Sequence, residues 1–467
     1  MFEEYIESKK NEIINNLIKL ISFKSISTTN INSPFPFGME CSNCLHYVLD
    51  LAKSMGFKTK NVDEYCGYIE FGEGEELIGI VGHLDVVPAN DGWKHDPFNA
   101  DISEGKLYGR GSVDDKGPVI ASLYAMKAVM DNYKINKRVR LILGLNEEQN
   151  WKCIKYYKEH EEIPTFGFSP DANFPVIFAE KGILSSWFES DYNNSSIIKI
   201  LSIDCNNNPF NVVPKICKID LELSSIINKR VFIEKIHLSN KKYNFNIEIN
   251  ELSINKVQIV LNGEASHSAH PELGSNAISK LIIVLNELFN SYNCNCNIFQ
   301  FFSDKINTEL SGKSLGIDFK DESGSLTLNV AKFLFEDNKI KIGMNLRIPV
   351  TIKISEIEDK LKKEAEKYTV LSYSHSSMDP LHLSLENDLV KKLLDIYNQK
   401  TNSQEKPIAI GGGTFARAFD NFVSFGPTFP GDSDLCHQND EYIEIEKLLL
   451  CANIYADAIY ELCNDLH

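Results

Sequence analysis

The sequence lacks an excess of basic residues. Its 467 residues carry 48 Lys and Arg against 65 Asp and Glu, which gives a net charge of −17. Nucleic acids and anionic membrane surfaces attract basic proteins, so this balance argues against either as a partner. The surplus of carboxylates suits bound metal cations and equally suits a solvated acidic surface, and charge alone does not separate the two.

Long apolar runs are also missing. No run approaches the roughly 20 residues that cross a membrane, and the N-terminal sequence MFEEYIESKKNEII has no basic segment followed by an apolar stretch. We therefore expect no signal peptide. The 11 cysteines are odd in number and irregularly spaced, which is typical of reduced thiols. These features predict a cytoplasmic protein in which the Cys41-x-x-Cys44 pair is buried on a helix.

Alternating strand and helix patterns mark the first part of the chain. Short apolar runs at Leu77–Val81, Val139–Leu143 and Val176–Phe178 read as strands, and residues 117–131 and 149–160 read as helices. Runs of this kind suit strands that are buried on both faces. The rhythm predicts a three-layer α/β/α domain with a mixed, largely parallel sheet.

The composition and the pattern of predicted elements change near residue 185. Residues 185–382 are rich in Asn, Ile and Lys, and they combine alternating strand-like stretches with helices near 275–291 and 353–367. The α/β pattern of the first part of the chain resumes after residue 383. We therefore expect one domain formed by residues 1–184 and 383–467, interrupted by a large α+β domain of about 200 residues.

Histidine and carboxylate motifs lie where predicted strands end. His83 and Asp85 follow one apolar strand, and a histidine that binds a metal usually donates its second N–H to a carboxylate. Asp114 and Asp115 lie between glycines, as in a tight turn that aims a carboxylate inward. Each motif alone has a structural explanation, such as a surface turn with a solvated charge pair.

Three further motifs follow the same pattern. Glu147 and Glu148 leave the end of a strand, where one could bind a metal while the other moves a proton, although acids also favour helix N-termini. Asp171 follows the strand at 166–168, and His437 precedes the final helix. Together the motifs supply two imidazoles and several carboxylates, which suit zinc, manganese or cobalt. Four ligands satisfy one tetrahedral zinc, so the surplus predicts a carboxylate that bridges two metals.

The motifs taken in order resemble those of the PepV-type dipeptidases. These belong to the superfamily of two-metal exopeptidases that includes carnosinase, glutamate carboxypeptidase and succinyl-diaminopimelate desuccinylase. The resemblance covers essentially the whole chain. It rests on the segments GHLDVVP, YGRGSVDDKGP, NEE, FSPDANFP, GEASHSAHPELGSNA, NLRIP, GGGTFARA and FPGDSDLCHQ.

The resemblance implies a set of metal ligands. His83 and Asp171 would hold one metal, Glu148 and His437 would hold the other, and Asp114 would bridge them. Two divalent ions per chain are expected, with zinc first and manganese or cobalt as alternatives. The resemblance also implies a cis peptide bond after Asp114.

The resemblance implies catalytic roles as well. Glu147 would be the general base, and Asp85 would orient the imidazole of His83. In the inserted domain, which would act as a lid built from two α+β subunits, His267 rather than the nearby His270 would reach the scissile carbonyl. The metals would lower the pKa of a shared water towards about 7, and the resulting hydroxide would attack the peptide bond.

Substrate recognition is implied for Arg347, Asn211 and Gly413. Arg347 and Asn211 would grip the substrate carboxylate, although the run Asn206–Asn208 departs from the family pattern and puts the alignment of Asn211 in doubt. Asn146 is a second departure, since this branch usually has Asp before the two glutamates.

The expected function is hydrolysis of unblocked dipeptides by a cytoplasmic monomer, since a doubled lid within one chain would replace a dimer contact. One alternative is an N-acyl amino-acid hydrolase of the same superfamily. A second alternative is a non-catalytic small-molecule binding protein on this scaffold. Retention of Glu147 argues against the second, because a binding protein needs no general base.

Overall fold

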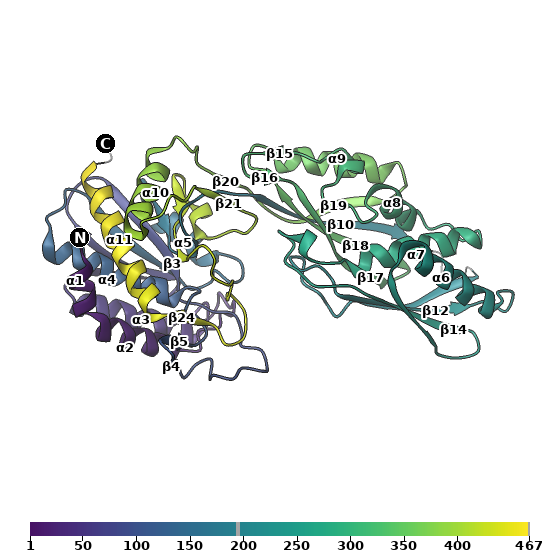
Figure 1. Cartoon of the computed structure of the whole chain (residues 1–467), viewed down its shortest axis with the longest axis horizontal. Coiled ribbons are helices and arrows are strands. Elements are labelled where there is room, and N and C mark those ends of the chain that lie inside the picture. The colour runs from purple at the N-terminus through teal and green to yellow at the C-terminus, as the bar shows by residue number, and fades with distance from the viewer. Residues whose placement is uncertain (193–196, 466–467) are drawn as a thin grey trace. The chain divides into compact units, whose positions relative to one another are not determined.

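The structure is a computed structural model that describes residues 1–192 and 197–465, and it divides into two compact units. Both are drawn in Figure 1. The first unit comprises Met1–Ala179, Leu381–Ile408 and Gly413–His467, and the second comprises Glu180–Pro380 and Ala409–Gly412.

The limits of the units differ slightly from the predicted ones. The second unit begins at Glu180 rather than at residue 185, because the strand β10 (Gly182–Asp191) pairs along its whole length with β18 (Lys339–Ile348). Ala409–Gly412 joins this unit through hydrogen bonds that the sequence did not suggest. The N–H of Lys181 donates to the carbonyl of Ile410 at 3.0 Å.

A nine-stranded mixed sheet forms the centre of the first unit. Its order is β1-β2-β6-β3-β7-β22-β9-β20, with β21 paired to β9. The four strands β6, β3, β7 and β22 are parallel to one another, and β1 and β2 are antiparallel. The strands span Lys58–Val62 (β1), Cys66–Gly72 (β2), Leu77–His83 (β3), Arg138–Gly144 (β6), Phe166–Ser169 (β7), Ile177–Glu180 (β9), Leu381–His382 (β20), Ile408–Ile410 (β21) and Phe422–Ser424 (β22).

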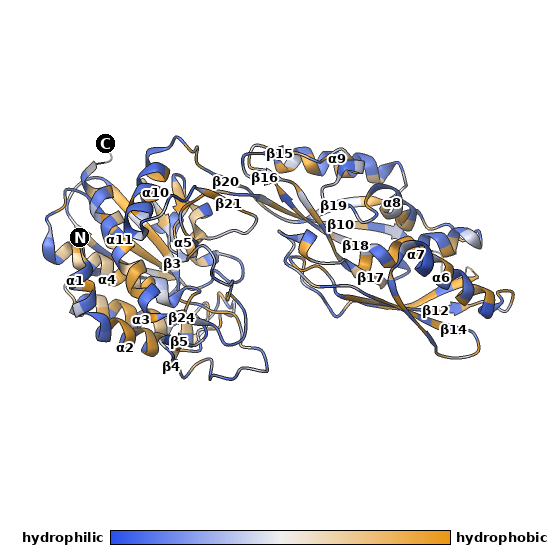
Figure 2. Cartoon of the chain, in the orientation of Figure 1, coloured by the Kyte–Doolittle hydropathy of each residue, from blue (hydrophilic) through white to orange (hydrophobic). Residues whose placement is uncertain are grey.

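Helices cover this sheet. They are α1 (Glu3–Ser8), α2 (Lys10–Ile21), α3 (Met39–Ser54), α4 (Lys116–Asn132), α5 (Lys152–His160), α10 (Asp388–Thr401) and α11 (Ile445–Asp465). Every residue of β3 is buried, as expected for a strand covered on both faces. Figure 2 shows hydrophobic stripes on these helices, and the buried positions of α2 recur at helical spacing, as in Ile13, Leu17 and Leu20. The predicted α/β class with a mostly parallel central sheet is confirmed.

Short strands surround the sheet. A small three-stranded sheet contains β4 (Asp101–Ser103), β5 (Lys106–Tyr108) and β24 (Tyr442–Glu444), and β8 (Ala172–Asn173) pairs with β23 (Pro427–Thr428). A short 3-10 helix spans Phe415–Ala418. Cys41 and Cys44 are fully buried on α3, as predicted.

The second unit contains two four-stranded antiparallel sheets. One has the order β17-β18-β10-β19 and the other β11-β12-β14-β13. Besides β10 and β18, the strands are β11 (Ile198–Asp204), β12 (Ile216–Leu223), β13 (Asn246–Glu251), β14 (Lys256–Asn262), β17 (Thr327–Glu336) and β19 (Leu371–Met378), with a small hairpin of β15 (Lys320–Asp321) and β16 (Gly324–Ser325).

In the described part of this unit, four helices pack on these sheets around one continuous apolar core. They are α6 (Lys229–Tyr243), α7 (Ala277–Ser291), α8 (Asn297–Lys305) and α9 (Ile354–Glu366), and 3-10 turns span Pro271–Leu273 and Lys313–Leu315. The helix α7 begins where the side chain of Asn276 accepts a hydrogen bond from the N–H of Ser279, which satisfies one of the first free donors of the helix.

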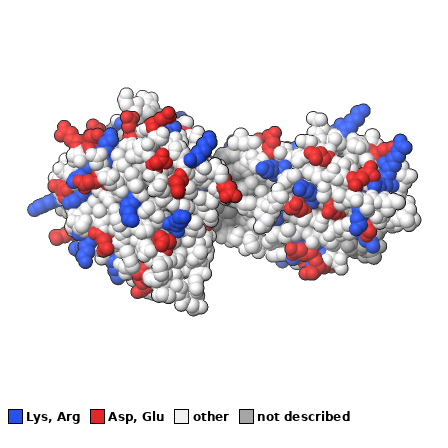
Figure 3. All heavy atoms as spheres, turned by 90° about the horizontal axis from the view of Figure 1, so that it is seen from below, with Lys and Arg blue, Asp and Glu red and all other residues white. Residues whose placement is uncertain are grey.

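Charged side chains of both signs are interspersed on the face that Figure 3 displays. Among the described residues, none of the helices is both long and apolar enough to cross a membrane.

Candidate metal centre

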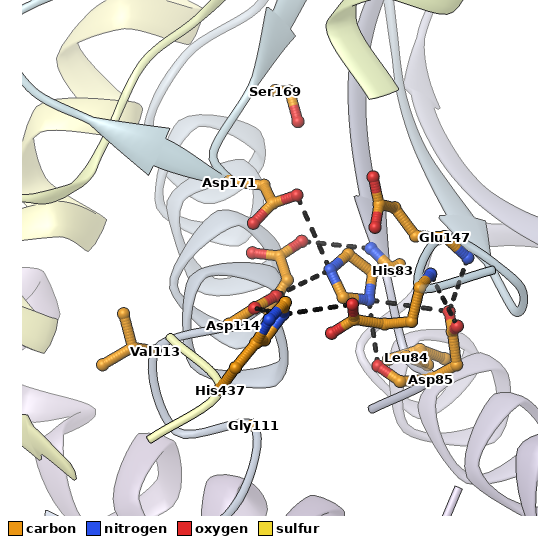
Figure 4. A network of polar contacts seen from close by, with 12 residues as sticks. His83, Leu84, Asp85, Gly111, Val113, Asp114, Glu147, Ser169, Asp171 and His437 are labelled. Carbon is orange, nitrogen blue, oxygen red and sulfur yellow. Dashed lines mark hydrogen bonds and ion pairs between the residues drawn. The ribbon is translucent and has the colours of Figure 1, made fainter. Parts of the chain in front are cut away.

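Three neighbouring parallel strands deliver the candidate ligands to one edge of the sheet. His83 ends β3, the pair Glu147 and Glu148 follows β6, and Asp171 lies two residues beyond β7. Since β6, β3 and β7 are parallel neighbours, their carboxyl ends meet, and open α/β sheets bind ligands at this edge. Figure 4 shows the side chains of His83, Glu147 and Asp171 converging with those of Asp114 and His437.

The imidazole of His83 is fully buried and held in one tautomer. Its Nδ1 lies 2.9 Å from the main-chain carbonyl oxygen of Asp85. A carbonyl only accepts, so Nδ1 carries the proton and Nε2 keeps a lone pair. That lone pair points towards Asp114 and Asp171, at 2.9 and 3.6 Å. An imidazole fixed in this way is ready to bind a metal through Nε2.

Asp114 faces both histidines with different oxygens. Its Oδ1 lies 2.9 Å from Nε2 of His83, and its Oδ2 lies 3.2 Å from Nε2 of His437. The latter nitrogen is also 3.1 Å from Oε2 of Glu148. The peptide bond between Asp114 and Asp115 is cis, as predicted. One carboxylate therefore belongs to two candidate ligand groups, which is the arrangement that a bridging ligand requires.

The two groups fit divalent cations. In the described residues, the ligand atoms of His83, Asp114 and Asp171 lie within 4.8 Å of one another, and so do those of Asp114, Glu148 and His437. Among the described residues, the buried Oε1 of Glu148 has no hydrogen-bond partner. An imidazole with two carboxylates at each position suits zinc, manganese or cobalt.

Crowding of buried carboxyl groups shifts their titration. Burial, together with the nearby Asp114 carboxylate, raises the pKa of Glu148 to about 7. Burial likewise raises the pKa of Asp171 to about 6. Hydrogen bonds to Asp114 and Glu148 raise the pKa of His437 to about 11. Positive charge at the centre of such a cluster stabilises the ionised carboxylates, and a bound divalent cation would supply that charge.

Asp85 contacts His83, the residue that it is predicted to orient, and it also contacts the two glutamates. Its carboxylate lies 3.5 Å from His83 Nδ1 and accepts hydrogen bonds from the N–H groups of Glu147 and Glu148, at 3.0 and 3.1 Å. Asp85 comes after the end of β3, so its carbonyl rather than its carboxylate reaches the imidazole. It thus orients His83 through the main chain and also holds the two glutamates.

The Glu147 carboxyl lies half-buried beside the candidate ligands. Burial raises its pKa well above the ordinary value, and the carboxylates of Asp171 and Glu148 raise it further. A raised pKa makes the carboxylate a stronger proton acceptor than an ordinary glutamate, as a general base requires.

Two neighbours of the ligands were not assigned a role from the sequence. The carboxylate of Asp115 accepts a hydrogen bond from the N–H of His83 at 3.0 Å. A Cβ at Gly82 would lie 2.4 Å from that carboxylate, so a glycine is required there. Asn146 is fully buried and donates to the hydroxyl of Ser27 at 2.8 Å. The amide in place of the family's usual Asp therefore serves a local hydrogen bond.

The predicted residues of the second unit gather around Ser268. The main chain of Asn211 accepts from the N–H of Ser268 at 2.8 Å, and Val212 forms a β-bridge with His267. Nη2 of Arg347 donates to the hydroxyl of Ser268 at 3.0 Å. Asn211, His267 and Arg347, which are far apart in the sequence, are thus neighbours.

The imidazole of His267 is also polarised by a hydrogen bond. Its Nδ1 accepts from the N–H of Ala269 at 3.2 Å, so in the neutral form Nε2 carries the proton. His270 lies 3.3 Å from the carboxylate of Glu272 and is exposed. Gly413 starts a segment of the first unit, and a Cβ there would lie 3.1 Å from the guanidinium of Arg417.

Comparison with known proteins identifies the family to which the chain belongs. Residues 79–461 match the model of peptidase family M20/M25/M40. The chain is 37% identical over 472 residues to "Putative dipeptidase YtjP" of Bacillus subtilis, with 99% of both chains covered. The chain therefore belongs to peptidase family M20/M25/M40, and it is a metallopeptidase, a hydrolase.

Solved structures share the fold. Human carnosine dipeptidase 1 aligns with a TM-score of 0.60 and 14% identity, covering 99% of this chain and 98% of that one. The Bacillus subtilis YXEP protein, described as a dinuclear metal binding peptidase from the M20 family, aligns with a TM-score of 0.50 and 9% identity, covering 98% and 100%.

Removal of divalent cations should lower the melting temperature. A ligand present at about 1,000 times its Kd stabilises the folded state by about 4 kcal/mol, and for a chain of this length that corresponds to a shift of a few degrees. Differential scanning fluorimetry of chelated protein, before and after adding zinc, manganese or cobalt, measures the shift. Magnesium and calcium prefer all-oxygen sites, so they should restore less of the lost melting temperature than zinc, manganese or cobalt. A melting temperature insensitive to every cation would contradict the metal centre.

Proposed function

We propose that the chain is a dipeptidase that hydrolyses the peptide bond of unblocked dipeptides with two divalent cations, zinc first and manganese or cobalt as alternatives. The observation that carries the proposal is Asp114, whose two carboxylate oxygens face His83 and His437 separately. The name of the Bacillus subtilis relative, a putative dipeptidase, supports the choice of substrate.

The residues of the first unit would hold the cations and move the proton. His83 and Asp171 would hold one cation, Glu148 and His437 the other, and Asp114 both. When bound, the cations would polarise the peptide carbonyl and make a water molecule more acidic.

Glu147 would take the proton of that water and return it to the leaving amine. The raised pKa of its carboxyl suits a group that accepts a proton. The hydrogen bonds from the N–H groups of Glu147 and Glu148 to the Asp85 carboxylate would keep the side chain in place during the transfer.

The residues of the second unit would recognise the substrate. The Nε2–H of His267 would donate to the developing oxyanion. Arg347 would bind the C-terminal carboxylate through charge-assisted hydrogen bonds, with Asn211 and, from the first unit, Gly413 contributing further contacts. Recognition of a free carboxylate one residue beyond the scissile bond would restrict the enzyme to short substrates. The proposal includes a cytoplasmic monomer as the functional form.

A substrate panel tests the proposal. Protein reconstituted with zinc, manganese or cobalt is assayed against dipeptides, the corresponding N-acetyl amino acids and tripeptides. Dipeptides should be cleaved with the highest kcat/KM. Preference for N-acetyl amino acids would instead support the deacylase alternative, and metal-loaded protein that cleaves none of them would favour a binding protein.

A further inference from the structure

We propose that Glu441 is a positioning residue of the metal centre. Its carboxylate ties the segment that carries His437 to the loop that carries Asp114, so that one side chain sets the spacing of ligands to both metals. The proposal rests on the proposed two-metal function. It assigns a task to a residue that contacts neither ligand side chain.

Glu441 lies four residues after His437 and is fully buried. Its Oε1 accepts hydrogen bonds from the N–H groups of Gly111, Val113 and Asp114 at 3.1, 2.8 and 3.3 Å. Its Oε2 lies 3.1 Å from the same N–H of Gly111. A single carboxylate thus gathers the N–H groups of the turn that ends in Asp114.

The main chain reinforces this connection. The N–H of Gly109 donates to the carbonyl of Glu441 at 2.9 Å, and Tyr442 pairs with Tyr108 in the antiparallel ladder of β24 and β5. The neighbouring Asp440 carboxylate accepts from the N–H of Lys94 at 2.7 Å. The segment after His437 is therefore fixed to the loop before Asp114 by several bonds, of which those to the Glu441 carboxylate lie nearest to Asp114.

Arg110 supplies the opposite charge. Its Nη1 donates to Oε2 of Glu441 at 2.7 Å, and its side chain is 1% exposed. The guanidinium carbon lies 5.1 Å from the centre of the Trp93 indole ring. A buried ion pair of this kind often adds little stability compared with an apolar pair of similar volume. The hydrogen bonds that the Glu441 carboxylate accepts from main-chain N–H groups therefore account for the buried pair better than its contribution to stability does.

Loss of this carboxylate should weaken both metal positions together. The two candidate groups share Asp114, and the main-chain N–H of Asp114 is one of the donors that Glu441 accepts from. If the turn moves, the two oxygens of Asp114 no longer face His83 and His437 at once. Replacing a group that orients metal ligands typically costs about 10–100-fold in metal affinity.

The test compares metal binding by wild type and Glu441→Gln. An amide places an NH₂ group among N–H donors and leaves the Arg110 charge uncompensated. Isothermal titration of metal-free protein with Mn²⁺ should give two sites in wild type, and affinity about 10–100-fold weaker for both in the variant. The magnetic coupling of the two Mn²⁺ ions, seen by electron paramagnetic resonance, should weaken or vanish. Glu444→Gln, three residues away and paired with Lys447 at 3.2 Å, is the matched control and should bind like wild type.

A second variant separates positioning from folding. Arg110→Met combined with Glu441→Met removes both buried charges at similar volume and also removes the acceptor for the N–H groups. We expect the metal-free double variant to fold, with a melting temperature lowered by the unpaired N–H groups, while metal affinity and coupling fall. We expect Glu441→Asp to recover part of the affinity. Wild-type metal binding in Glu441→Gln or in the double variant would overturn the proposal. An unfolded double variant in the absence of metal would also overturn it, because the role of Glu441 would then be structural.

These readouts do not depend on dipeptide turnover. Wild-type protein that binds two coupled ions but cleaves no dipeptide would refute the proposed function, while the effect of Glu441 on the ion pair would still be measured.

Discussion

Glu147→Gln should leave two metals bound per chain while hydrolysis of dipeptides falls by about 10²–10⁴-fold, the usual contribution of a general base. The amide cannot take a proton, yet it is close to the carboxyl group in size. The main-chain N–H groups of residues 147 and 148 donate to Asp85 whatever the side chain is, so the neighbouring ligand Glu148 should stay in position.

Metal analysis of the purified variant and kcat for one dipeptide decide the result. Glu159→Gln, an exposed position on α5, is the control and should keep the wild-type rate and metal content. A Glu147→Gln variant with wild-type turnover would remove this residue from the mechanism. A variant that loses a metal would reassign it as a ligand.

Arg347→Ala should lower kcat/KM for free dipeptides about ten- to hundredfold and should affect C-terminally amidated dipeptides much less. A buried charge-assisted hydrogen bond contributes about 1.5–3 kcal/mol, and amidation removes the charged partner. Wild type should therefore discriminate strongly against amides, and the variant should lose this discrimination.

The structure also offers a competing explanation for an effect of Arg347. Its guanidinium bonds the side chain of Asn345, the carbonyl of Gly411 and the hydroxyl of Ser268, so its removal could loosen the second unit. Loosening would harm free and amidated substrates equally and would lower the melting temperature. Arg230 is an exposed arginine of the same unit. The control variant Arg230→Ala should change kcat/KM for neither the free nor the amidated dipeptide. Equal losses on both substrates would make Arg347 a structural residue.

The regular elements of the fold were largely predictable. The apolar runs at Leu77–Val81 and Val139–Leu143 are the strands β3 and β6, and the helix expected at residues 117–131 is α4. These elements are buried, so the hydrophobic pattern alone marks them. The helix α6 was not predicted, because its buried residues are few and it is rich in Lys.

The candidate ligands were predictable for a related reason. Strand ends are visible in the sequence, and parallel neighbours bring their ends together, so His83, Glu148 and Asp171 could be grouped before any geometry was known. The sequence did not show that the Asp85 carboxylate also accepts hydrogen bonds from the N–H groups of Glu147 and Glu148. That detail depends on where the chain turns after β3, which local patterns do not determine.

Glu441 illustrates what the sequence could not reveal. It stands among other acidic residues near the C-terminus, including Asp440 and Glu444, and nothing in its local pattern separates it from a solvated surface charge. Its burial and its bonds to the loop before α4 arise from contacts between segments more than 300 residues apart. Arg110, its ion-pair partner, belongs to the YGRGSVDDKGP segment, but the sequence did not indicate which residue it pairs with.

Activity measured during a metal titration tests the central claim most directly. Metal-free protein is mixed with increasing equivalents of zinc, manganese or cobalt, and hydrolysis of one unblocked dipeptide is followed beside metal binding. The account predicts that kcat/KM rises until two equivalents are bound and then stays constant. Full activity without added metal in chelated protein, or an absence of dipeptide hydrolysis with two metals bound, would contradict it.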